Sequence, residues 1–184
     1  KLKDTLRLWP NYQTDYAPLV EFAKEKELPC VASNIQRKYA SLLFKKGRSA
    51  LDTLPETIKQ QMTPLNFAFV TTLSQYQDMK QMGAHMGPGM GWRMVEAQAI
   101  KDATMAHFIL NNPWRTPKTV HLHFNGAYHS DFYQGIMWYL QHEGAARILT
   151  ISTVSQDNVQ KLDKEHLGRA DFIICVPSNM TSTH

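Results

Sequence analysis

The chain has 184 residues, 43% of them hydrophobic and 20% charged, which suits one folded domain with a substantial core and excludes disorder over most of its length. Its formal net charge is +4, and its lysines and arginines are scattered without a run of five like charges, which argues against a nucleic-acid-binding surface. No apolar run reaches the roughly 18 residues that span a bilayer. A modest positive charge suits an anionic ligand without requiring one.

The two cysteines, Cys30 and Cys175, lie in apolar, strand-like stretches. Two cysteines make no disulfide framework, so we predict buried free thiols. The chain opens at Lys1 on a half-helical segment, and we expect it to be a piece of a longer protein whose targeting signals lie upstream.

The sequence pattern of the first half of the chain predicts mainly helices. Apolar residues fall on one helical face over 15–27, and residues 29–33 predict a short buried strand. Helices are expected over 35–46, ended by Gly47, over 55–62 and over 92–110. Residues 64–81 fit a helix or a strand equally well. Residues 82–91 hold four glycines, three methionines and a proline, which predicts a mobile loop.

The second half alternates strands with helices. Strands are expected over 119–124, 148–154 and 171–176, with helices over 132–141 and 158–166 between them and a frayed tail over 178–184. This order predicts an α/β fold, a mostly parallel sheet with helices on both faces. We treat residues 1–184 as one domain.

A tight turn follows the first of these strands. Ligands of α/β sheets gather where strands end, and Gly126 allows a sharp turn that presents His129 at the start of the next helix. Tyr128 and Tyr133 lie close by, and imidazole and phenolate are both iron ligands. Asp131 is a candidate for orienting the His129 ring. The alternative is that His129 is an ordinary helix-cap or surface residue.

His121 and His123 share one face of the predicted strand because their spacing is two. They form a metal pair with His129, or they are partly buried strand residues with local hydrogen bonds.

The glycine-rich segment and the helix after it offer further candidates. His85, Met86 and Met90 are soft or borderline ligands and adaptable apolar contacts, unless this is a surface loop without a role. Gln98 and Asp102 are four residues apart and share a helix face, which lines a pocket or packs on the sheet.

Four stretches in this order resemble the ChaN family, iron-regulated lipoproteins of the Tiki superfamily. They are Leu8–Tyr12 with Tyr16–Ala23, Val31–Asn34 with Arg37 and Tyr39, Glu96–Gln98 with Lys101–Ala106, and Gly126–His129 completed by Gly135 and Ile136. The resemblance implies a bacterial cell-envelope protein (periplasm or outer membrane), lipid-anchored upstream of the domain and working in iron or haem uptake or storage. It implies haem bound at a homodimer interface, and outer-membrane haem transport components as partners.

In the family a tyrosine is the axial iron ligand and a histidine lies nearby. His129 matches the histidine of the superfamily's second glycine–x–x–histidine motif. Tyr133 and Tyr128 are the candidates for the tyrosine, with Tyr12 and Tyr16 behind them, and Arg93 is a candidate for the haem propionates.

This sequence departs from the family in two places. The first glycine–x–x–histidine motif is absent, so we expect one or more amino-terminal strands outside the chain. Asp131 stands where the family often has a basic residue.

Three functions follow as hypotheses. The first is a haem-binding protein with a tyrosine ligand to iron and a nearby histidine. The second is a metal-dependent hydrolase, as in other branches of the superfamily. The third is a scaffold domain that binds a protein partner. No nucleophile elbow, phosphate-binding loop or paired-cysteine motif is present, which lowers the expectation of an enzyme.

Overall fold

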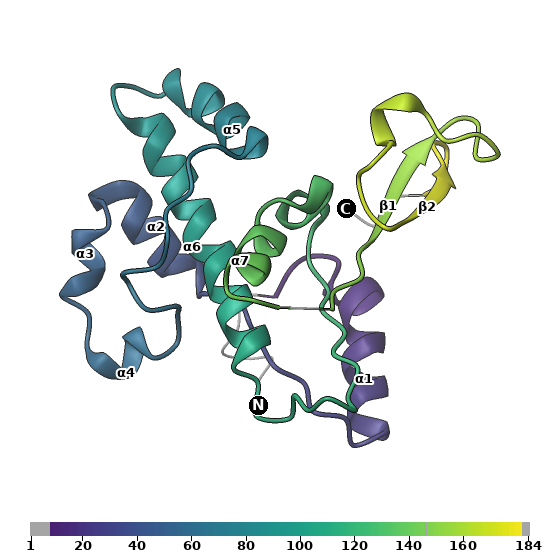
Figure 1. The fold of residues 1–184 in the computed structure, drawn as a ribbon, viewed down its shortest axis with the longest axis horizontal. Coiled ribbons are helices and arrows are strands. Elements are labelled where there is room, and N and C mark those ends of the chain that lie inside the picture. The colour runs from purple at the N-terminus through teal and green to yellow at the C-terminus, as the bar shows by residue number, and fades with distance from the viewer. Residues whose placement is uncertain (1–7, 146, 182–184) are drawn as a thin grey trace.

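The computed structural model describes residues 8–145 and 147–181, and helices dominate it (Figure 1). The elements, in chain order, are η1 (Tyr12–Tyr16), α1 (Ala17–Glu25), α2 (Arg37–Lys46), α3 (Ser49–Asp52), α4 (Glu56–Lys59), α5 (Ser74–Ala84), α6 (Met90–Leu110), η2 (Ala127–His129), η3 (Asp131–Tyr133), α7 (Ile136–His142), β1 (Ile151–Gln156), η4 (Lys164–His166) and β2 (Phe172–Pro177). The predicted α/β class is confirmed, since the helices accompany a small parallel sheet.

Helices α2, α5 and α7 all pack against helix α6 (Figure 1). Alanines and other good helix formers fill its 21 residues, so both local propensity and packing favour the helix. Val95, Ala99 and Ile100 have no exposed surface and form the centre of the core. The predicted helix over 92–110 is therefore confirmed, and so is the helix over 35–46, which ends at Gly47 with φ +86°.

The glycine-rich segment forms a helix corner, and the prediction of a mobile loop over its whole length was wrong. Helix α5 runs to Ala84, and α6 starts at Met90 after a short turn. The two helices cross closely at their glycines: a β-carbon on Gly83 would lie 2.8 Å from Cα of Gly91, and one on Gly91 would lie 2.3 Å from the carbonyl oxygen of Lys80. These glycines serve close packing rather than flexibility.

Two predicted strands do not form among the described residues. Residues 29–33 and 119–124 are extended but pair with no neighbouring strand. Val120, Leu122 and Phe124 are exposed along the second segment, and so is His121, whereas His123 is half-buried. Alternating β-branched residues favour extended backbone, but a strand also needs a partner for its main-chain hydrogen bonds.

The sheet consists of β1 and β2, which run parallel with Ile151 opposite Phe172 and Gln156 opposite Pro177. The predictions of strands over 148–154 and 171–176 are confirmed within a few residues. The predicted helix over 158–166 is only the short turn η4. The side chain of Gln156 explains this, because it bonds the backbone of Asn158, Lys161 and Asp163 and so competes with helical hydrogen bonds.

The remaining sequence predictions were partly correct. The helix expected over 132–141 begins only at Ile136, because Phe132 and Tyr133 have φ of +55° and +59° and break the helical path. The helix over 55–62 shortens to α4. Both cysteines are free, as predicted, but neither is buried. Cys30 is exposed because the strand expected around it does not form, and Cys175 is only partly buried on β2.

Candidate functional site

The glycine–x–x–histidine turn lies against the middle of α6. Residues 127–129 form the short helix η2, and a hydrogen bond from the His129 amide to the Gly126 carbonyl (2.9 Å) closes the turn. The His129 side chain is 20% exposed. Its ring turns toward α6, where Gln98 and Asp102 lie one helical turn apart on the same face.

Asp102 is the centre of this arrangement and has no exposed side-chain surface. Its Oδ1 bonds Nδ1 of His129, and its Oδ2 accepts a hydrogen bond from the Tyr76 hydroxyl (2.7 Å). Gln98 Nε2 is 3.5 Å from Oδ1 of Asp102 and 2.9 Å from Nδ1 of His129. Residues from α5, α6 and the turn after 119–124 therefore meet at one carboxylate.

The electrostatics follow from burial. Burial raises the pKa of Asp102, and the hydrogen bonds from His129 and Tyr76 oppose that rise. Burial beside the Asp102 carboxylate raises the pKa of Tyr76 far above its ordinary value, so this phenol stays protonated and acts as a hydrogen-bond donor.

Asp131 does not orient His129, so that expectation was wrong. Its Oδ1 accepts from the Ser152 hydroxyl (3.0 Å) and its Oδ2 pairs with the Arg169 guanidinium (3.3 Å). The Phe132 amide also donates to the Arg169 carbonyl (2.8 Å). The backbone reverses at Phe132, which turns Asp131 toward the strands. Asp102 holds the imidazole instead.

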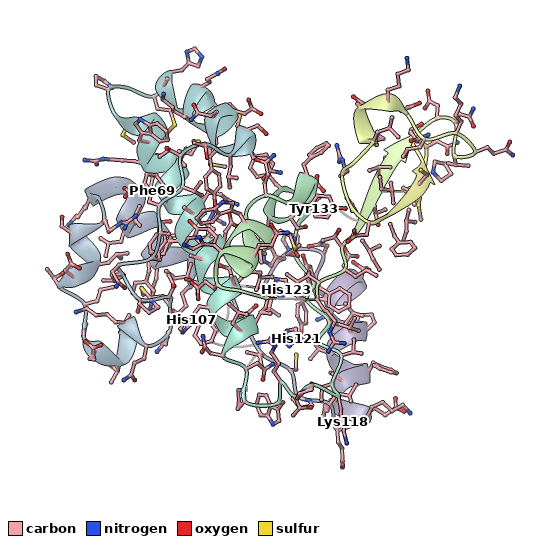
Figure 2. All side chains as sticks on the ribbon, in the orientation of Figure 1. Phe69, His107, Lys118, His121, His123 and Tyr133 are labelled. Atoms are coloured by element: carbon pink, nitrogen blue, oxygen red, sulfur yellow. The ribbon has the colours of Figure 1, made fainter. Side chains whose placement is uncertain are left out.

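The two predicted tyrosine ligands lie on different sides of the turn. The Tyr128 hydroxyl donates to the Gln75 carbonyl on α5 (2.9 Å), and burial raises the pKa of this phenol. The Tyr133 hydroxyl donates to the Asp171 carboxylate (3.0 Å), so it faces the strands β1 and β2 (Figure 2). The other two candidate tyrosines, Tyr12 and Tyr16, stack on each other in η1.

His121 and His123 lie on the extended segment that leads to the turn (Figure 2). Burial and the neighbouring imidazoles of His121 and His129 lower the pKa of His123 to about 4. Nε2 of His123 is buried without a hydrogen-bond partner in the described part of the chain. The described residues contain no group of three or more histidine, cysteine, aspartate or glutamate side chains that would hold a metal ion.

The other predicted ligands lie at the α5–α6 corner. Met90 is the first residue of α6, eight residues before Gln98, which corresponds to about 12 Å along a helix. His85 and Met86 are exposed on the turn before it, and the Arg93 guanidinium donates to the Lys45 carbonyl (2.7 Å). The structure therefore does not bring these residues to His129. A hollow of about 180 Å³ at this corner is lined by Lys80, Ala84, Gly87, Pro88, Gly89, Gly91 and Trp92.

A candidate for an anion contact that the sequence did not single out lies beside Asp102. Lys101 is half-buried on α6, and burial and the Arg37 charge lower its pKa while Asp102 opposes the change. Across residues 8–145 and 147–181, neither Lys101 nor Arg37 forms an ion pair. Two unpaired cations at the junction of α2 and α6 suit a carboxylate ligand.

Comparison with known proteins identifies a family for most of the chain. The sequence profile of a family described as haem-binding uptake, Tiki superfamily, ChaN, covers residues 1–140. No curated protein and no solved structure matches the chain significantly. No helix in the described ranges is long and apolar enough to cross a bilayer.

Proposed function

Because the chain belongs to the ChaN family of haem-binding uptake proteins in the Tiki superfamily, we propose that it binds haem on the surface formed by His129 and Tyr128. The observation that carries this proposal is the His129 ring: Asp102 holds one ring nitrogen, while no described residue bonds the other and the side chain remains partly exposed. An imidazole held in this way is a typical metal-facing group.

The residues present fit an iron porphyrin. Imidazole and phenol are both haem ligands, and exposed aromatic rings at Phe124, Tyr128 and Phe132 offer apolar surface around the turn. Lys101 and Arg37 supply positive charge for the propionates in place of Arg93, whose guanidinium is engaged elsewhere. If haem binds here, its iron would take imidazole or phenolate as ligands from these residues.

Tyr128 suits the axial phenol better than Tyr133. To bind iron, its hydroxyl would give up only a hydrogen bond to a neutral backbone carbonyl, whereas the Tyr133 hydroxyl would have to leave the Asp171 carboxylate. A hydrogen bond to a charged acceptor is roughly twice as strong as one between neutral groups. We therefore assign the role of tyrosine ligand to iron to Tyr128 and a structural role to Tyr133.

The cellular setting is part of the proposal and has its support in the family alone. We place the protein in the bacterial cell envelope, anchored by a lipid upstream of the domain, as a homodimer that takes up or stores haem and meets outer-membrane transport components.

Titration of the purified protein with haemin tests the proposal. We expect a saturable shift of the Soret band for the wild-type chain, and a weaker or absent shift for H129A. H85A is the matched control, because His85 is an exposed histidine on the far corner and its loss leaves the titration unchanged. A wild-type titration without saturation would rule the proposal out.

A further inference from the structure

The contacts of His129 are unequal at its two ring nitrogens. Nδ1 faces the fully buried Asp102 carboxylate, which also receives the Tyr76 hydroxyl at 2.7 Å. No described residue bonds Nε2. A neutral imidazole carries one proton, on one nitrogen or the other, and this choice decides what the partly exposed edge of the ring offers to a ligand.

The two tautomers have opposite chemistry. With the proton on Nδ1, His129 donates to Asp102, and Nε2 presents a lone pair that can bind a metal. With the proton on Nε2, the exposed edge is a hydrogen-bond donor and cannot coordinate iron. Nδ1 must then accept a hydrogen bond. The donor is either a protonated Asp102 or the Gln98 amide, whose nitrogen is 2.9 Å away.

The hydrogen-bond donors around Asp102 favour the first arrangement. The Tyr76 hydroxyl donates to Oδ2, and Nδ1 of His129 lies on Oδ1. In this arrangement the Gln98 side chain must turn its amide oxygen, rather than its nitrogen, to Nδ1, because two donors do not bond each other. A hydrogen bond from Nδ1–H to a carboxylate is about twice as strong as a neutral bond from Gln98 to a bare Nδ1, and the geometry places Oδ1 of Asp102 against Nδ1.

From this geometry we infer that Asp102 is the positioning residue of the site: it fixes the His129 proton on Nδ1 and directs the Nε2 lone pair to the ligand. Tyr76 acts through Asp102 by holding the second carboxylate oxygen. The inference rests on the proposed function only where it names haem iron as the ligand, because the tautomer is a property of the protein alone.

Nitrogen-15 NMR of the histidine side chains in the haem-free protein tests the tautomer directly. At about pH 8 we expect a protonated Nδ1 and an unprotonated Nε2 for His129. A protonated Nε2 in the wild-type protein would overturn the inference. Because this measurement needs no substitution, it stands even if a variant fails to fold.

Variants then identify the residue responsible. In D102N, with the fold checked by amide dispersion, the Nε2-protonated form should become detectable, while D131N should keep the wild-type tautomer because Asp131 bonds Ser152 and Arg169 instead. Q98L should also keep the wild-type tautomer. Equal tautomer ratios in wild-type, D102N and D131N would contradict a role for Asp102.

Haemin binding supplies the second readout. D102N should weaken haemin affinity by roughly 10- to 100-fold and raise the reduction potential of the bound iron, because the imidazole loses a charged partner. D131N should change neither quantity. If the wild-type chain binds no haemin while its tautomer is as expected, the proposed function fails and the positioning role of Asp102 stands.

Discussion

Gly135 lies directly beneath the backbone of His129. A β-carbon at Gly135 would lie 2.4 Å from the His129 carbonyl oxygen and 3.2 Å from Oδ2 of Asp102, and the residue has φ +53°. The start of α7 and the glycine–x–x–histidine turn are therefore packed too closely for any side chain at this position.

We expect G135A to destabilise the protein by about 3 kcal/mol or more, because it adds a clash to the cost of a left-handed alanine. It should also weaken haemin binding, since the backbone that carries His129 must move. The matched control is G144A, where φ is +83° but nothing lies within 4 Å of the added carbon. That variant should lose only about 1–2 kcal/mol. Urea unfolding measures both, and equal losses would show that the contact with His129 is unimportant.

Replacing the two candidate ligand tyrosines separates their roles. Y128F should weaken haemin binding and change the visible spectrum of the complex, whereas Y133F should leave both close to wild type. Each variant loses one hydrogen bond, to the Gln75 carbonyl or to the Asp171 carboxylate, and Y128F should cost about 0.5–3 kcal/mol of stability. A spectral change in Y133F alone would move the axial role to Tyr133.

The Asp131–Arg169 pair should hold the strands β1 and β2 on the helices. D131N removes the contacts to Arg169 and Ser152, so we expect amide hydrogen exchange in both strands to accelerate, at a cost of about 1–3 kcal/mol in local stability, while α6 stays protected. E96Q is the control, because it weakens a similarly half-buried pair, Arg48–Glu96, among the helices. Unchanged strand exchange in D131N would show that other contacts hold the sheet.

His123 should make the fold sensitive to acid. Its pKa is about 4 in the folded protein, lowered by burial and then by His121 and His129, against about 6.5 in an unfolded chain. The unfolded state therefore binds more protons between these values. The stability that the neutral imidazole contributes is fully present above pH 6.5 and declines as the pH falls toward 4, by roughly 1–3 kcal/mol.

The free energy of unfolding measured from pH 7 to pH 4 checks this effect. H123Q should show a shallower pH dependence than the wild-type protein, and H85Q, at an exposed position, should keep the wild-type slope. Identical slopes for wild type and H123Q would contradict the burial of a neutral imidazole at this position.

The sequence predicted the parts of the site that depend on local pattern. Gly126 and His129 mark the turn, and the four-residue spacing of Gln98 and Asp102 places both on one helix face. Their meeting with His129 depends on how the turn packs against α6, which no local pattern encodes. The choice of Asp102 over Asp131 as its partner was missed for the same reason, because the reversal at Phe132 comes from tertiary contacts.

The same distinction between local pattern and tertiary packing holds for the fold. The helices α2 and α6 were predictable because their propensity and their apolar faces agree. The residues from Val120 to Phe124 have a strand pattern, but a ladder depends on a neighbour that the pattern does not supply. The glycines at 83 and 91 misled the prediction because a close helix crossing and a flexible loop require the same residue.

Tyr76 and His129 reach the same carboxylate from opposite sides, although 53 positions of chain separate them. A displacement of the His129 ring would therefore disturb the hydrogen bond of the buried Tyr76 hydroxyl. The packing of α5 against α6 at Tyr76 is therefore tied to the position of the His129 ring, so occupancy of the surface and order of the core are coupled.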